Sequence, residues 1–206
     1  GADKVFDFSL GNPNVPAPSC VNDTIIELLK TQDPVILHGY TSAQGAANVR
    51  QAIADYINKQ FGTQITADLI YMTVGAAASL SVCIKALALP NDEFITFTPY
   101  FPEYRVFVEA AGAKLVEVKS NDEDFQIDFE RFTAAITEHT KAVIINSPNN
   151  PSGVVLSEKS ITMLSDILRE KSKAYGHTIY LISDEPYREL IYDDIKVPYL
   201  INYYDN

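Results

Sequence analysis

The chain has 206 residues, a length that suits one large domain with a small additional part better than two full domains. Hydrophobic residues make up 47% of the chain and charged residues 21%, a balance that excludes disorder for most of the sequence. The formal net charge of -11 has the wrong sign for a surface that neutralises nucleic-acid phosphates. We therefore expect no nucleic-acid partner.

Membrane and metal sites find little support in the composition. No apolar run approaches the roughly 20 residues of a membrane helix, so we expect neither membrane association nor a secretion signal. The two cysteines, Cys20 and Cys83, are too few for a disulfide framework and favour the reducing cytoplasm. The three histidines, His38, His139 and His177, are scattered along the chain, and we expect no metal ion.

The first 70 residues carry helical patterns and no strand pattern. A Pro-rich arm covers residues 11–18, and a helix is predicted around residues 23–30. A second helix is predicted over residues 46–60, with apolar side chains such as Val49 and Ile53 on one face.

From residue 70 onward, strand and helix patterns alternate. Short apolar runs rich in β-branched and aromatic residues predict buried strands at residues 70–74, 94–97, 115–118, 142–146 and 179–183. Helical periodicity separates these runs at residues 77–89, 102–111, 129–137 and 158–175. Because parallel strands need crossover connections, the alternation predicts an α/β fold of three layers, with a mostly parallel sheet between helices.

Unusual segments follow four of the five runs, at the edge where an open parallel sheet binds its ligands. Residues 75–79, Gly-Ala-Ala-Ala-Ser, let the backbone approach a ligand closely and then open a helix. The free N–H groups at such a helix start suit one phosphate. A plain strand-to-helix turn is the alternative interpretation.

The next two segments also allow a functional and a purely structural interpretation. Residues 98–104, Thr-Pro-Tyr-Phe-Pro-Glu-Tyr, hold aromatic rings between prolines and could form either a wall for a flat ligand ring or a core-packing turn. Residues 147–153 are turn formers with two asparagines, which suit a small polar ligand but need no function as a loop.

Asp184 follows the last apolar run directly. A carboxylate at the end of a buried strand is costly to remove from water unless a cationic group meets it. The sequence therefore predicts either a cationic partner for Asp184 or a cap for a following helix.

These segments together resemble the pyridoxal-phosphate-dependent aminotransferases of fold type I, the aspartate aminotransferase family. The resemblance runs through nearly the whole chain in family order. Its motifs are Leu10-Gly11-Asn12-Pro13, Tyr40 with Gly45 and Arg50, Gly75-Ala76-Ala77, Pro99-Tyr100-Phe101-Pro102, Asn150-Pro151-Ser152-Gly153 and Asp184-Glu185-Pro186-Tyr187. The last two motifs are the most specific pair.

The resemblance implies a site for pyridoxal 5'-phosphate. After Gly75, the amides of Ala76 and Ala77 would hold the cofactor phosphate, and Phe101 would stack on the pyridine ring. Asn150 would hydrogen-bond the phenolic oxygen of that ring and the substrate carboxylate. The first two roles agree with the physical interpretation of the same segments.

Further roles are implied for residues at both ends of the chain. Tyr187 would donate to the same phenolic oxygen, and Asp184 would keep the pyridine nitrogen protonated, so that the ring can accept electrons from the substrate α-carbon. Tyr40 would reach the phosphate of a neighbouring subunit, which implies a homodimer, and Gly11 would lie near the substrate carboxylate. We expect Arg50 to be structural.

The lysine that forms a Schiff base with the cofactor in this family has no match in the sequence. It should follow the Asp184 motif on a strand, but the last lysine, Lys196, has the context of a surface loop. The two family arginines that bind the phosphate and the substrate carboxylate, and the C-terminal small domain, are also unmatched. We therefore expect a chain truncated before the lysine and inactive by itself.

The resemblance predicts an aminotransferase that moves an amino group between an L-amino acid, aspartate or a similar one, and a 2-oxo acid. We expect an N-terminal arm and the start of a small domain at residues 1–45, and an incomplete pyridoxal-phosphate-binding large domain at residues 46–206. One alternative is another fold type I enzyme, such as a C–S lyase, a decarboxylase or a cyclase. A non-catalytic aminotransferase-like domain is a further alternative.

Overall fold

The computed structural model describes residues 5, 11 and 15–205, and it divides into two compact units, Gly1–Ala43 and Gln44–Asn206. The expected Leu10-Gly11-Asn12-Pro13 motif lies outside the described residues except for Gly11, which is exposed. The assignment of residues 1–45 to an arm and the start of a small domain, and of residues 46–206 to a cofactor-binding large domain, stays a prediction.

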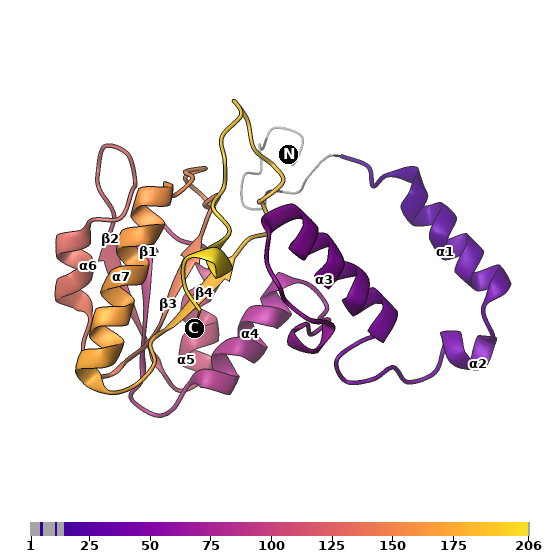
Figure 1. The fold of residues 1–206 in the computed structure, drawn as a ribbon, viewed down its shortest axis with the longest axis horizontal. Coiled ribbons are helices and arrows are strands. Elements are labelled where there is room, and N and C mark those ends of the chain that lie inside the picture. The colour runs from indigo at the N-terminus through magenta and orange to yellow at the C-terminus, as the bar shows by residue number, and fades with distance from the viewer. Residues whose placement is uncertain (1–4, 6–10, 12–14, 206) are drawn as a thin grey trace. The chain divides into compact units, whose positions relative to one another are not determined.

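The first unit contains two described helices, α1 (Ser19–Thr31) and α2 (Pro34–Leu37) (Figure 1). Helix α1 confirms the helix predicted around residues 23–30, and none of its residues is buried. Helix α2 was not predicted because one turn is too short to show a period. Its start is nevertheless encoded locally, since the Asp33 side chain accepts a hydrogen bond from the Val35 amide at 2.7 Å and Pro34 occupies the first helical position.

The second unit is built on four parallel strands in the order β2-β1-β3-β4 (Figure 1). The strands are β1 (Glu93–Thr98), β2 (Lys114–Lys119), β3 (Thr140–Asn146) and β4 (Tyr180–Asp184). These confirm four of the five predicted runs and the predicted α/β fold. Strand β3 is paired on both sides and buried almost throughout, as expected of a central parallel strand.

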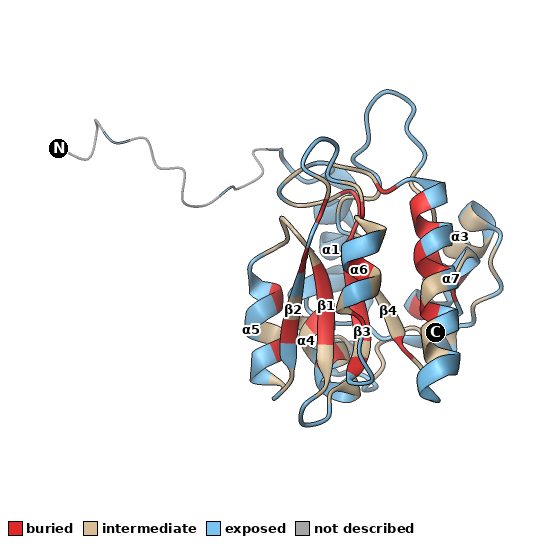
Figure 2. Ribbon diagram, turned by 90° about the vertical axis from the view of Figure 1, so that its left-hand side faces the viewer, coloured by how far each residue is buried: buried red, intermediate tan, exposed pale blue. Residues whose placement is uncertain are grey.

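Helices cover both faces of this sheet, so that alternate residues of each strand enter different cores. On one face, Ile95 and Val143 pack with buried residues of α6 (Phe129–Ala135) and α7 (Glu158–Tyr175). On the other face, Phe94 and Ile144 pack with α4 (Ala76–Leu87) and α5 (Glu103–Ala110). Figure 2 shows the buried residues along the strands and along one side of α7. The predicted three-layer arrangement is therefore confirmed.

The remaining described elements of this unit are one long helix, α3 (Ala47–Phe61), and two short 3-10 turns, η2 (Ala67–Leu69) and η3 (Leu200–Asn202). Helix α3 confirms the prediction for residues 46–60 and ends at Gly62, whose φ of 69° places it in the left-handed region that favours glycine. The 3-10 turns were not predicted, since three residues leave no periodic pattern.

The strand predicted at residues 70–74 is wrong. This segment is irregular, and in the described chain no strand lies beside it. Tyr71 and Val74 are 61% and 96% exposed, and the Met72 amide donates to the Gln44 carbonyl instead of to a sheet. A short apolar run does not by itself form a strand, because the backbone groups of a strand need a partner strand.

Helix α7 provides a test of how local sequence sets an element boundary. The Ser157 hydroxyl accepts a hydrogen bond from the Ser160 amide at 3.1 Å and so caps the helix. Replacement of Ser157 with Ala should lower the free energy of unfolding by about 1 kcal/mol, as measured by urea denaturation. Ser157→Asp should retain the cap.

Lys159→Ala, two residues further along and exposed, is the matched control. It should change the free energy of unfolding by no more than about 0.5 kcal/mol. Equal losses in the Ser157→Ala and Lys159→Ala variants would contradict the assignment of Ser157 as the cap.

Candidate active site

The carboxyl ends of β3 and β4, the segment after β1 and the start of α4 meet at one open pocket of about 190 Å³. It is lined by Ala76, Ala77, Leu80, Phe101, Asn146, Asn150, Asp184, Pro186 and Tyr187. A second hollow of about 420 Å³, lined in part by Ser79, Cys83 and Glu185, shares several of these residues. The structure therefore brings six of the predicted site residues together, from segments up to 111 positions apart (76 to 187).

The phosphate end of the predicted site is the first turn of α4. Gly75 immediately precedes the helix with φ 91° and ψ 168°, a conformation that is essentially restricted to glycine. The Thr73 and Ser79 hydroxyls lie 2.5 Å apart, and the Thr73 hydroxyl donates to the Gly75 carbonyl at 3.1 Å. Ala76 and Ala77 are exposed, so their amides, which have no partner within the helix, are open to a ligand.

Asp184 ends strand β4 and is 9% exposed. The Tyr104 hydroxyl donates to Asp184 Oδ2 at 2.6 Å, whereas no described residue donates a hydrogen bond to Oδ1. Burial raises the pKa of the Asp184 carboxyl, although the hydrogen bond from Tyr104 acts in the opposite direction. A buried carboxylate with one unpartnered oxygen on a pocket wall fits a cationic N–H of a ligand ring.

Asn146 holds the neighbouring backbone in place, a role that the sequence analysis missed. Its side-chain amide donates to the Asp184 carbonyl at 2.8 Å, and its Oδ1 accepts from the Asn150 amide at 2.6 Å. Tyr104 was missed as well, because its partner Asp184 lies 80 residues away. The only sequence signal for Asn146 is a polar residue at the end of a fully apolar run.

Asn150 and Tyr187 also line the pocket. The Asn150 side-chain amide donates to the Tyr187 hydroxyl at 3.3 Å, so the two groups that the resemblance assigns to one phenolic oxygen lie next to each other. Phe101 adds an aromatic surface and meets the Tyr104 ring edge-on, with the ring centroids 5.8 Å apart and an angle of 77° between the planes.

Asn149 has a structural role despite its position beside Asn150. Its Oδ1 accepts hydrogen bonds from the Ser152 amide and hydroxyl at 3.0 and 2.7 Å, and its side-chain amide donates to the Pro99 carbonyl at 3.4 Å. These bonds shape the loop after β3 and leave Asn150 as the asparagine that lines the pocket.

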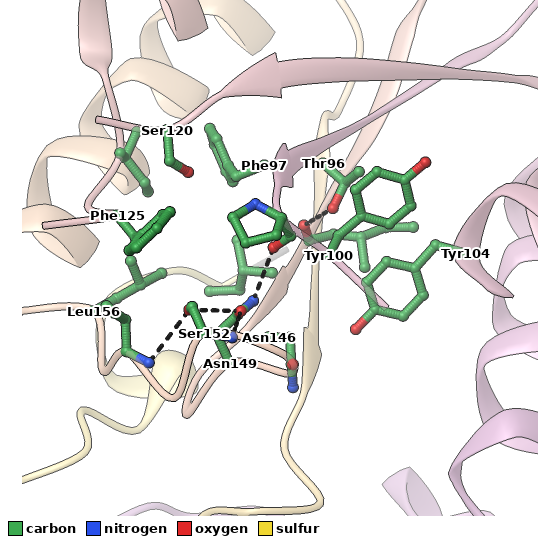
Figure 3. A pocket seen from close by; sticks show the side chains of 15 residues that line it. Thr96, Phe97, Tyr100, Tyr104, Ser120, Phe125, Asn146, Asn149, Ser152 and Leu156 are labelled. Atoms are coloured by element: carbon green, nitrogen blue, oxygen red, sulfur yellow. Dashed lines mark hydrogen bonds between the residues drawn. The ribbon is translucent and has the colours of Figure 1, made fainter. Parts of the chain in front are cut away.

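A narrow hollow lies behind this loop, between the ends of β1 and β3 (Figure 3). Its lining includes Thr96, Tyr100, Tyr104 and Ser120 but no charged side chain. It therefore lacks the ionic group that the predicted cofactor needs, and we assign the site to the pocket beside Asp184.

Several predicted residues are not part of this pocket. Tyr40 and Gly11 belong to the first unit and are exposed, so their roles stay predictions. Arg50 is buried and donates to the Gly45 and Ala67 carbonyls at 3.2 and 2.5 Å, which agrees with the expected structural role. Lys196 is exposed, and no lysine is among the described residues that line the pocket.

Residues 3–205 match the family model described as aminotransferase class I and II. An aspartate/prephenate aminotransferase of Thermus thermophilus is 36% identical over 197 residues, which are 94% of this chain and 48% of that protein. An arginine–pyruvate transaminase of Pseudomonas aeruginosa is 29% identical, over 93% of this chain and 46% of its own length.

The fold is also similar to solved structures. The crystal structure of an amino transferase from Eubacterium rectale has a TM-score of 0.96 and 60% identity, covering 99% of this chain and 52% of that chain. The chain thus spans about half the length of the relatives that it matches. None of the helices in the described part is long and apolar enough to cross a membrane.

The raised pKa of Asp184 predicts how stability depends on pH. In the cofactor-free protein, the folded state holds this proton more tightly than the unfolded state, whose usual pKa is 3.8. Stability from this group is therefore fully present below pH 3.8 and is lost as the pH rises through the raised folded pKa. Asp184→Asn removes that loss, so the variant should be at least as stable as the wild type at pH 7.

Urea denaturation from pH 3 to pH 8 measures this difference. The two proteins should converge in unfolding free energy at the acidic end, with Asp166→Asn on the exposed face of α7 as the control that follows the wild type throughout. A loss of stability in Asp184→Asn that grows with pH would contradict the raised pKa.

Proposed function

The chain belongs to the family of class I and II aminotransferases, and from this membership we propose that the protein transfers an amino group between an L-amino acid and a 2-oxo acid with the help of pyridoxal 5'-phosphate. The observation that carries the proposal is the Asp184 carboxylate. It is buried, has one oxygen without a hydrogen bond from the described residues, and shares a pocket with the start of α4.

The pocket contains a suitable group for each end of the proposed cofactor. The open amides of Ala76 and Ala77, at the positive end of the α4 dipole, would bind the phosphate. Phe101 would lie against the ring, and Asn150 and Tyr187 would both hydrogen-bond its phenolic oxygen. When bound, the cofactor ring accepts electrons from the substrate α-carbon.

The contribution of Asp184 is to hold a proton on the pyridine nitrogen. An ionised carboxylate in a buried place stabilises a protonated ring nitrogen more strongly than it could in water. Tyr104 donates to the other carboxylate oxygen, and Asn146 holds the Asp184 carbonyl, so the carboxylate is positioned before any ligand arrives.

The substrate that we propose is aspartate or a similar common amino acid. Support comes from relatives that are named for aspartate and prephenate. The arginine–pyruvate transaminase matches at lower identity. Asn150 would contact the substrate carboxylate, with Gly11 nearby. We also propose a homodimer in which Tyr40 reaches the neighbouring subunit's phosphate site, and a cytoplasmic location.

Residues 1–206 alone should bind the cofactor without turnover, because no lysine lines the pocket in the described residues. Borohydride reduction in the presence of pyridoxal phosphate, followed by intact-mass measurement and peptide mapping, tests this proposal. Stoichiometric labelling of one lysine together with turnover of an amino acid would contradict it.

The full-length protein provides the main test of function. It should bind pyridoxal phosphate and transaminate aspartate or another amino acid in a coupled assay with a panel of 2-oxo acids. Asp184→Asn should bind the cofactor more weakly and lose most activity, because a neutral amide cannot hold the ring nitrogen protonated. Asp166→Asn, on the exposed face of α7, is the matched control and should behave as the wild type does.

Near wild-type activity in Asp184→Asn would contradict the role of Asp184. Release of ammonia, sulfide or carbon dioxide from the amino acid, without amino transfer to any 2-oxo acid, would instead favour a lyase or decarboxylase that uses the same site.

Phe101 should act as a flat surface for the cofactor ring. Phe101→Ala should weaken cofactor binding by about 1 to 3 kcal/mol, the range of lost aromatic burial and stacking, whereas Phe101→Trp retains a flat ring and should preserve affinity. Fluorescence titration of the full-length protein with pyridoxal phosphate measures both variants. Equal affinities for Phe101 and Ala would show that the ring rests elsewhere.

A further inference from the structure

Tyr104, the single described donor to the Asp184 carboxylate, is itself held by two aromatic neighbours. Its ring is nearly parallel to the ring of Tyr100, with centroids 6.1 Å apart and an angle of 10° between the planes. Phe101 meets the same ring edge-on. Figure 3 shows the Tyr100 and Tyr104 rings side by side, with their hydroxyl oxygens at opposite ends.

The Tyr100 hydroxyl is hydrogen-bonded to strand β2. Its hydroxyl donates to Glu117 Oε1, which also accepts from Arg105 Nη2 at 2.7 Å. Arg105 Nη1 donates to Glu109 Oε1 at 3.0 Å. The hydrogen bonds from Tyr100 and Arg105 lower the pKa of Glu117, so it is an ionised acceptor. Glu117 and Glu109 therefore share Arg105, but only Glu117 contacts Tyr100.

The Tyr100 ring packs against the core on the α4 and α5 side of the sheet, but this packing does not fill the space around it. Tyr100 is half-buried, and it lines the narrow hollow behind the loop after β3. A ring with open space on one side can turn unless a polar contact holds it. The Tyr100 hydroxyl donates to Glu117, and its other polar neighbour, Arg105, is itself bound to Glu117.

We propose that Glu117 is a positioning residue for the cofactor site: through Tyr100 it keeps the Tyr104 hydroxyl in place to donate to Asp184. This inference rests on the proposed function, since it concerns the carboxylate that would face the cofactor ring. The competing explanation is that Glu117 only stabilises the β2 edge through Arg105. In that case, Glu117 and Glu109 would have similar effects.

Cofactor affinity in the full-length protein separates the two explanations. Glu117→Ala and Tyr100→Phe should each weaken pyridoxal-phosphate binding by about two- to tenfold, the effect of losing one hydrogen bond. Glu109→Ala, which removes the other partner of Arg105, should change the affinity by less than about twofold. Similar losses in Glu117→Ala and Glu109→Ala would overturn the proposal.

A double variant tests whether the effect passes through Tyr104. Glu117→Ala combined with Tyr104→Phe should bind the cofactor no more weakly than Tyr104→Phe alone, and the absorbance spectrum of the bound cofactor should change in the same way in both single variants. Additive losses, or a wild-type spectrum in Glu117→Ala, would overturn the proposal.

Unfolding of the cofactor-free protein keeps this test independent of the proposed function. The same pair of variants, compared by urea denaturation, should show non-additive effects on stability because the residues share one set of contacts. Such coupling, together with unchanged cofactor binding in Asp184→Asn, would refute the proposed function and leave the contact between Glu117 and Tyr104 established. Additivity in unfolding would refute the positioning role itself.

Discussion

The site depends on one constraint, which is that a carboxylate buried at the end of a strand must be partnered. Asp184 receives one hydrogen bond from Tyr104 and keeps a second oxygen without a donor from the described residues. Burial without a positive partner raises the free energy of the ionised form, and the raised pKa expresses that cost. A protonated ring nitrogen would offset the cost, so affinity for such a ligand and instability of the empty site have the same origin.

The parallel sheet brings Asp184 and its hydrogen-bond partners together. Because all four strands point the same way, the segments after β1, β3 and β4 reach the same edge. Tyr104 follows β1, Asn146 ends β3 and Asp184 ends β4, so three residues from separate strand–helix units form one hydrogen-bonded group. Helices on both faces hold the strands in register, which fixes these residues relative to one another.

Around this group, hydrogen bonds divide similar residues into different tasks. The Asn149 side chain accepts its hydrogen bonds within the loop after β3. Its neighbour Asn150 lines the pocket and donates a hydrogen bond to Tyr187. Tyr104 donates a hydrogen bond to the Asp184 carboxylate, whereas Tyr100 packs against the Tyr104 ring and donates to Glu117 on β2. Residues such as Asn149 and Tyr100, which do not line the pocket, therefore hold the residues that do line it in place.

The sequence by itself determined the α/β alternation and four strands, because buried parallel strands are continuous apolar runs. The start of α7 is also set by a local contact, since the structure shows that Ser157 caps this helix. Unusual residues after the apolar runs also pointed to Asp184 and to residues 98–104 and 147–153, and within these two segments the resemblance to aminotransferases implied Phe101 and Asn150. Only the tertiary structure decided that residues 70–74 form no strand and that Tyr104 and Asn146 hold Asp184. Strand pairing and hydrogen bonds between residues 38 or 80 positions apart depend on which chain segments become neighbours, and local patterns carry no record of that choice.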